Sequence, residues 1–117
     1  MPKFEAERIK DSDVYFIKDE SCSLLNDEET TDTLIKFFEK NQKIGFAYTD
    51  ILISKSDCSY IENIMYSDAL PEMPFFMRYN PDIDLEQQNF TAIMMNIFQR
   101  GLKFSHIPVV GCEINAS

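Results

Sequence analysis

The stretch that decides the fold is Ile44–Ile53, which reads IGFAYTDILI. Its residues are apolar apart from Gly45, Thr49 and Asp50, and this composition predicts a long strand within a sheet. A second apolar run, Val14–Ile17, is bounded by charged residues and predicts a strand that is buried on both faces. We expect these two strands to be neighbours at the centre of one sheet.

Helix signals lie on either side of these strands. Acidic residues at positions 27–32 favour the first turn of a helix, and an apolar stripe continues it to Asn41. Residues 90–98 place apolar side chains at positions i, i+3, i+4, i+7 and i+8, which predicts an amphipathic core helix that ends at Gly101. Residues 4–10 are interpreted as the end of a short helix.

The remaining segments complete an alternating pattern. Residues 102–107 alternate as a strand that we expect Pro108 to stop, and residues 109–114 either extend it or pair separately. Prolines interrupt the middle of the chain, with a short strand predicted at 75–77. The order of elements predicts an α/β fold, with a mostly parallel or mixed sheet and flanking helices. We expect residues 1–117 to form one domain.

Composition and charge limit the classes of function. The chain has 117 residues, 44% of them hydrophobic, which is enough for one buried core. Its 20 acidic residues exceed the 11 basic ones and give a net charge of -9, which disfavours nucleic acid and anionic membranes as partners. No apolar run predicts a transmembrane segment or a secretory signal. Cys22, Cys58 and Cys112 lack metal-ligand spacing, so we expect free buried thiols and a cytoplasmic protein.

Four polar residues are candidates for a site. Asp19 and Glu20 follow a predicted strand, and ligands of α/β sheets bind beyond the carboxyl ends of strands; the alternative is a solvated acidic loop. Asp50 is a charge within a strand, which predicts either a substrate contact or a residue at the sheet edge. His106 is the chain's one histidine. It is interpreted as a substrate-binding, metal-ligating or proton-transfer residue, or as a hydrogen-bonded strand residue in the core or at its rim.

Four segments together resemble a known family. Residues 13–27 resemble the strand and acidic metal loop of GT-A-fold glycosyltransferases, and residues 37–50 resemble the helix and strand that follow. Residues 85–90 resemble the catalytic helix, and residues 100–108 resemble the strand that begins with glycine and ends in Ile-Pro. The resemblance covers residues 4–110, in the family's order, and implies a partial Rossmann-like GT-A domain.

The resemblance implies an activity and a set of site residues. The activity is transfer of a sugar from a nucleotide-sugar donor to an acceptor hydroxyl, with Glu86 as the general base. Asp19 and Glu20 would hold Mg²⁺ or Mn²⁺ against the diphosphate leaving group. Asp84 would lie within reach of the same substrate site. Because the family's upstream nucleotide-binding units do not precede this sequence, we expect an incomplete enzyme that is inactive alone, and a homodimer that covers the exposed sheet edge.

The alternative is a protein of a different class. A small acidic binding or inhibitor protein without enzymatic activity fits the net charge of -9 and the short chain. The stretch Phe75–Tyr79 is aromatic and is predicted to be exposed, as a partner-binding surface would be.

Overall fold

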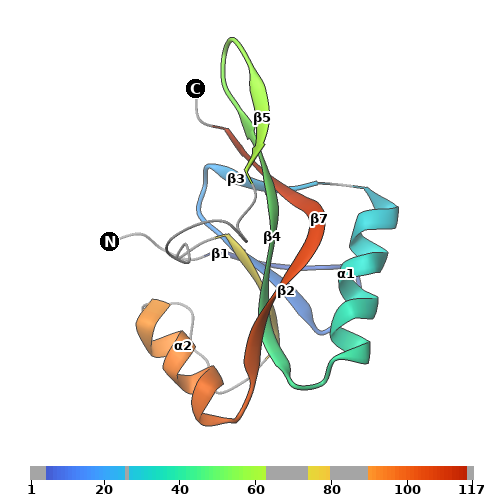
Figure 1. Ribbon diagram of the computed structural model, residues 1–117, viewed down its shortest axis with the longest axis vertical. Helices are drawn as coiled ribbons and strands as arrows, with labels where there is room; N and C mark the ends of the chain where they lie inside the picture. The colour runs from blue at the N-terminus through green and yellow to red at the C-terminus, as the bar shows by residue number, and fades with distance from the viewer. Residues whose placement is uncertain (1–4, 26, 63–73, 80–89, 116–117) are drawn as a thin grey trace.

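A computed structural model describes residues 5–25, 27–62, 74–79 and 90–115 (Figure 1). These residues form one sheet with two helices, and neither helix is long and apolar enough to cross a membrane. In chain order the elements are β1 (Glu5–Arg8), β2 (Val14–Lys18), β3 (Cys22–Leu24), α1 (Glu28–Lys40), β4 (Ile44–Ser54), β5 (Ser59–Glu62), β6 (Phe75–Arg78), α2 (Phe90–Gln99) and β7 (Lys103–Asn115).

The sheet is mixed and curls into a half-barrel, so the predicted Rossmann-like fold is wrong. Within the described part of the chain it has seven strands in the order β1-β2-β6-β4-β7-β3, and β5 pairs with β4 off this path. The pairing of β4 with β7 is parallel, whereas the other five pairings are antiparallel. A buried apolar run indicates burial on both faces of a strand, but it does not indicate the direction of the neighbouring strand.

Two predictions about the first strands are also wrong. Strand β6 separates β2 from β4, because Phe76 pairs with Phe16 on one side and with Ala47 on the other. Residues 5–8 form the edge strand β1 and not a helix. All four residues of β1 are exposed, so their polar pattern reflects the edge of a sheet and not the polar side of a helix.

The helices and the last strand agree better with the sequence pattern. Helices α1 and α2 lie where the periodicity predicts them. Strand β7 continues beyond Pro108 to Asn115, because the ladder with β4 is irregular there: Thr49 pairs with Ile107, and Asp50 pairs with Val110. A proline in such a bulge removes no ladder hydrogen bond, so it does not stop the strand.

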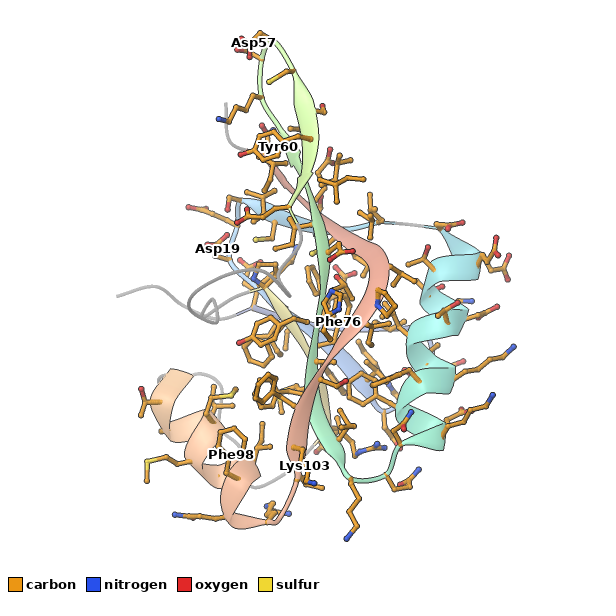
Figure 2. All side chains as sticks on the ribbon, viewed as in Figure 1. Asp19, Asp57, Tyr60, Phe76, Phe98 and Lys103 are labelled. Carbon is orange, nitrogen blue, oxygen red and sulfur yellow. The ribbon has the colours of Figure 1, made fainter. Side chains whose placement is uncertain are left out.

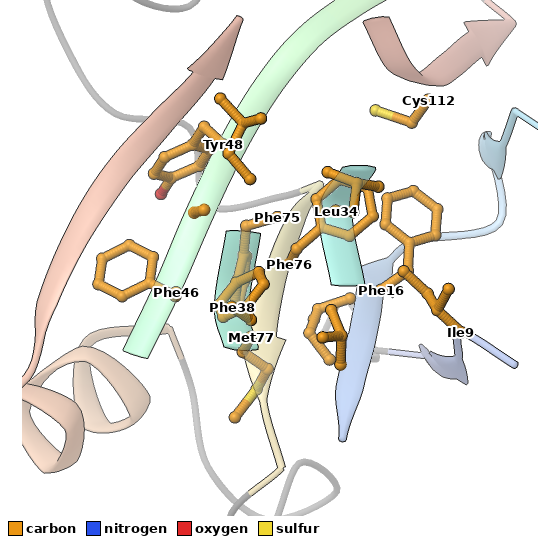
Figure 3. Close-up of a cluster of buried hydrophobic side chains, with 14 of the residues drawn as sticks. Ile9, Phe16, Leu34, Phe38, Phe46, Tyr48, Phe75, Phe76, Met77 and Cys112 are labelled. Carbon is orange, nitrogen blue, oxygen red and sulfur yellow. The ribbon is translucent and has the colours of Figure 1, made fainter. Parts of the chain in front are cut away.

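Aromatic side chains fill both faces of the sheet (Figure 3). On the face that α1 covers, Phe16 and Phe76 stack with ring centroids 4.9 Å apart. On the other face, Phe46 meets Phe75 edge-on at 5.9 Å. These four rings have no exposed surface. The sheet is therefore the middle layer of the core.

Arg78, the last residue of β6, joins the sheet to the end of α1. Its Nη2 donates hydrogen bonds to the carbonyl oxygens of Phe38 at 2.6 Å and Asn41 at 3.2 Å. The guanidinium carbon lies 5.5 Å from the centre of the Phe38 ring. A positive charge is favourable at the carboxyl end of a helix, where backbone carbonyls lack helical partners.

Two glycines allow close approaches to β4. A Cβ at Gly45 would lie 2.6 Å from Ile97 Cγ2, so glycine lets α2 pack directly on β4. A Cβ at Gly111 would lie 2.7 Å from Thr49 Oγ1 and 2.9 Å from Thr49 Cγ2. Gly111 therefore allows β7 to pass the Thr49 side chain at the irregular part of the ladder.

We expect Gly111→Ala to lower the free energy of unfolding by about 1–3 kcal/mol, because the added methyl group overlaps Thr49. Urea unfolding measures the loss. Thr49→Ala removes both of the overlapping atoms, so the double variant should recover part of the stability. Gly101→Ala is the control: its Cβ meets no atom, but its φ of +76° is strained for alanine, so Thr49→Ala should not recover that loss. Equal losses with and without Thr49→Ala would contradict the steric explanation for Gly111.

Candidate functional site

The structure brings together two residues that the sequence analysis proposed separately, Asp50 on β4 and His106 on β7. Asp50 Oδ1 lies 2.8 Å from His106 Nε2, although the residues are 56 positions apart. Their side chains are 16% and 14% exposed, so water screens the contact only partly. This pair is the first candidate site.

The register of the parallel strands creates the pair. His106 of β7 pairs with Tyr48 of β4. Asp50 lies two residues after Tyr48 on β4. Side chains two residues apart share a face of a strand, so Tyr48, Asp50 and His106 all lie on one face of the sheet. On this face the Tyr48 ring contacts the Phe75 ring, with centroids 6.3 Å apart. The polar contact between Asp50 and His106 therefore lies on the same face of the sheet as these aromatic rings.

The pair is poorly arranged for proton transfer to a substrate. A carboxylate only accepts hydrogen bonds, so in the neutral imidazole Nε2 donates to Asp50 and Nδ1 is the acceptor. His106 Nδ1 is buried and has no hydrogen-bond partner in the part of the chain described. A general base must reach the proton that it abstracts, and this nitrogen is buried. The arrangement supports a structural role, in which Asp50 and His106 link β4 to β7.

The neighbouring groups do not supply a nucleophile. Burial raises the pKa of the Cys112 thiol to about 12, so the thiol stays protonated at neutral pH. The Thr49 hydroxyl donates to the backbone oxygen of Asp50 at 3.1 Å. Burial also raises the pKa of Tyr48, which therefore stays a neutral phenol. None of these groups is activated for attack.

The predicted metal residues lie in the turn between β2 and β3. Asp19 Oδ1 accepts hydrogen bonds from the Ser21 amide at 2.8 Å and from the Ser21 hydroxyl at 2.6 Å. These bonds lower the pKa of Asp19 and fix the turn. Glu20 is exposed, and the described residues contain no group of three or more His, Cys, Asp or Glu side chains that could hold a metal ion. Binding of Mg²⁺ or Mn²⁺ by Asp19 and Glu20 therefore stays a prediction.

Two predicted residues cannot be placed. Asp84 and Glu86 lie outside the described residues, so their roles in substrate binding and as general base stay predictions.

One cleft lies between β1 and α1, and its charges balance. It has a volume of about 410 Å³. Lys10 in its wall contacts Asp32 at 2.8 Å and Glu28 at 3.8 Å, so its positive charge is already paired. The lining residues are Glu7, Arg8, Ile9, Lys10, Leu24, Glu28 and Thr31. This mixture indicates no class of ligand.

Surface aromatic residues lie elsewhere than expected. Phe75, Phe76 and Met77 are buried, and Tyr79 is the exposed residue of the predicted aromatic surface. Phe98 was expected in the core stripe of α2, but it is 49% exposed. The exposed aromatic surface was therefore expected on β6, but an exposed aromatic side chain lies on α2.

Three exposed apolar side chains lie on α2 and at the start of β7, and we name Met95, Phe98 and Phe104 the α2–β7 patch. They are 55%, 49% and 44% exposed, respectively. The Phe98 and Phe104 rings both contact the buried Phe46 ring, with centroids 5.9 Å and 5.5 Å away. Figure 2 shows Phe98 at the end of the molecule opposite Asp57 and Tyr60. In the sequence, this surface was indicated by Met95, an apolar residue outside the predicted core stripe of residues 90–98.

We expect Asp50→Ala to lower the free energy of unfolding by about 1–3 kcal/mol, because it leaves a largely buried imidazole N–H without a partner. The double variant Asp50→Ala/His106→Leu should lose less than the sum of the two single variants, with a coupling of about 1 kcal/mol. Urea unfolding of the four proteins measures it. Asp32→Ala breaks an exposed contact of the same 2.8 Å length to Lys10 and should cost less. Additive losses at Asp50 and His106 would show that the pair is not coupled.

Asp19 gives a prediction about acid stability. Its folded-state pKa is lowered, first by the Ser21 hydroxyl hydrogen bond, so the carboxylate stabilises the fold above its unfolded pKa of about 3.9. This contribution is lost as the pH falls through the lower folded pKa. Asp19→Asn should therefore be less stable than the wild type at pH 7 and should approach it in stability as the pH falls through the folded-state pKa of Asp19. Thermal unfolding across pH 2–7 tests this, and a difference that does not change with pH would contradict it.

Comparison with known proteins assigns this chain to no family. No protein-family model matches this chain, and no curated protein sequence matches it. The glycosyltransferase resemblance therefore stays a prediction from the sequence.

Proposed function

We propose that this protein is a small binding module without enzymatic activity, and that it docks another protein through the α2–β7 patch. The observation that carries the proposal is the joint exposure of Met95, Phe98 and Phe104. Large apolar side chains that are gathered on a surface are typical of protein interaction sites. Aromatic residues and methionine are also enriched at the centres of such sites.

The patch is better supported than the other exposed apolar side chains. Phe98 and Phe104 rest on Phe46, which has no exposed surface and belongs to the core. Their rings are therefore positioned before a partner arrives, and less conformational entropy is lost on binding. Tyr60 and Ile61 are 46% and 60% exposed, but they lie on β5, whose four residues are all exposed. Strand β5 pairs with β4 alone in the described part of the sheet.

Sugar transfer is the other candidate function, and it stays a prediction. Its proposed general base, Glu86, lies outside the described residues. Its proposed metal residue Asp19 is engaged in a turn, and the Rossmann-like fold that the resemblance implied is replaced by a curled mixed sheet. The cytoplasmic location that the sequence analysis expects also stays a prediction. Binding by the α2–β7 patch requires none of these features.

The test compares two matched double variants. Met95→Ser/Phe98→Ser removes apolar surface from the patch, and Tyr60→Ser/Ile61→Ser removes a similar surface from the hairpin at the opposite end. A partner isolated with the immobilised wild-type protein is purified, and its dissociation constant is measured by calorimetry. We expect the patch variant to bind about 10- to 100-fold more weakly, as for the loss of a central apolar anchor. The hairpin variant should bind like the wild type.

Thermal unfolding of both variants serves as the control for folding, since Phe98 also contacts the core residue Phe46. Weaker binding by the hairpin variant alone would overturn the proposed surface. A rise in melting temperature with a nucleotide sugar and Mn²⁺ together, but with neither alone, would favour sugar transfer instead.

A further inference from the structure

The local charge around the patch differs from that of the whole chain. The protein has a net charge of -9, yet the stretch from Gln87 to Cys112 contains no aspartate or glutamate. The basic residues of this stretch, apart from His106, are Arg100 and Lys103. The α2–β7 patch therefore lies in the part of the sequence that is free of acidic residues.

The fold adds further positive charge at the same end. Strands β4 and β7 are parallel, so they begin side by side: the Lys103 amide donates to the Lys43 carbonyl oxygen at 2.8 Å. Lys43 and Lys103 are both exposed, as are Arg100, which follows α2, and Lys40, which ends α1. Figure 2 shows Lys103 at the same end of the molecule as Phe98. Exposed Glu39 offsets part of their charge. We name Lys40, Lys43, Arg100 and Lys103 the basic end.

We infer that the α2–β7 patch binds an acidic segment of another protein, with apolar anchors on the patch and carboxylates facing the basic end. This inference rests on the proposed docking function of the patch. Charges interact strongly only within a Debye length, about 8 Å at physiological salt. Arg100 and Lys103 lie between the patch residues Phe98 and Phe104 in the chain, so a short bound segment experiences these two charges more than the net charge of the whole chain. The carboxylates give orientation and selectivity, and the apolar anchors give most of the affinity.

Two other occupants fit these observations less well. A second copy docked symmetrically through the patch would bring two basic ends together, and it would also join two chains of charge -9. Aromatic and basic side chains also suit single-stranded nucleic acid, but a polyanion extends beyond the basic end and meets the acidic remainder of the surface. A short acidic segment avoids both kinds of repulsion.

The experiment uses two synthetic peptides of twelve residues, each with a fluorescent label and two phenylalanines. One carries four glutamates and the other carries four lysines at the same positions. Fluorescence anisotropy with the full chain should give at least 10-fold tighter binding of the glutamate peptide. Its affinity should fall about 10-fold in Lys43→Glu/Lys103→Glu, and it should weaken further as salt rises from 0.05 to 0.5 M. The Met95→Ser/Phe98→Ser variant should bind both peptides more weakly than the wild type.

The outcomes separate this inference from the proposed function. Patch-dependent binding without preference for the glutamate peptide would overturn the acidic segment and leave the docking surface standing. Binding of both peptides that Met95→Ser/Phe98→Ser does not change would overturn the docking surface as well. Tighter binding of a labelled single-stranded oligonucleotide than of the glutamate peptide would overturn the inference in favour of nucleic acid. A dimer in sedimentation that Phe98→Ser dissociates would overturn it in favour of a second copy of the chain. Lys18→Glu, away from the basic end, is the charge control and should bind like the wild type.

Discussion

Strand β4 is the element on which the rest of the structure depends, because it forms ladders with three other strands. Its first half pairs with β6, its last residues pair with β5, and β7 runs parallel to it along its length. Its residues Phe46 and Ala47 are fully buried. Each helix lies against a different face of the sheet that β4 organises (Figure 1). A defect in this strand would disturb both layers of the core at once.

The parallel pairing of β4 with β7 has two consequences for function. Where the ladder is irregular, it places Asp50 next to His106 in a polar contact that is largely shielded from water. Where the ladder begins, it places Lys43 beside Lys103, next to the turn that follows α2. The first consequence is structural, because the second nitrogen of His106 is enclosed. The second creates a local positive charge on an acidic protein, and charge of this kind selects partners more than it stabilises a fold.

Support from the core distinguishes the α2–β7 patch from other exposed apolar surface. Phe98 and Phe104 are about half exposed, yet each ring contacts Phe46 in the interior. An aromatic ring that is held in place loses little entropy when it is covered. The same contacts contribute to the packing of α2, so binding and stability are linked at Phe98. Because Met95 is 55% exposed, we expect a change there to affect the surface with less effect on the core than a change at Phe98.

Local patterns in the sequence determined the two helices and the long strand at Ile44–Ser54, because periodicity records which side chains of one segment are buried. They also marked Asp50 and His106 as unusual polar residues within strands. Strand order and direction were decided by the tertiary structure, since the insertion of β6 between β2 and β4 depends on contacts between distant segments. The contact between Asp50 and His106, and the exposure of Phe98, likewise follow from register and from how α2 sits on the sheet. A pattern within one segment carries no information about which partner will cover it.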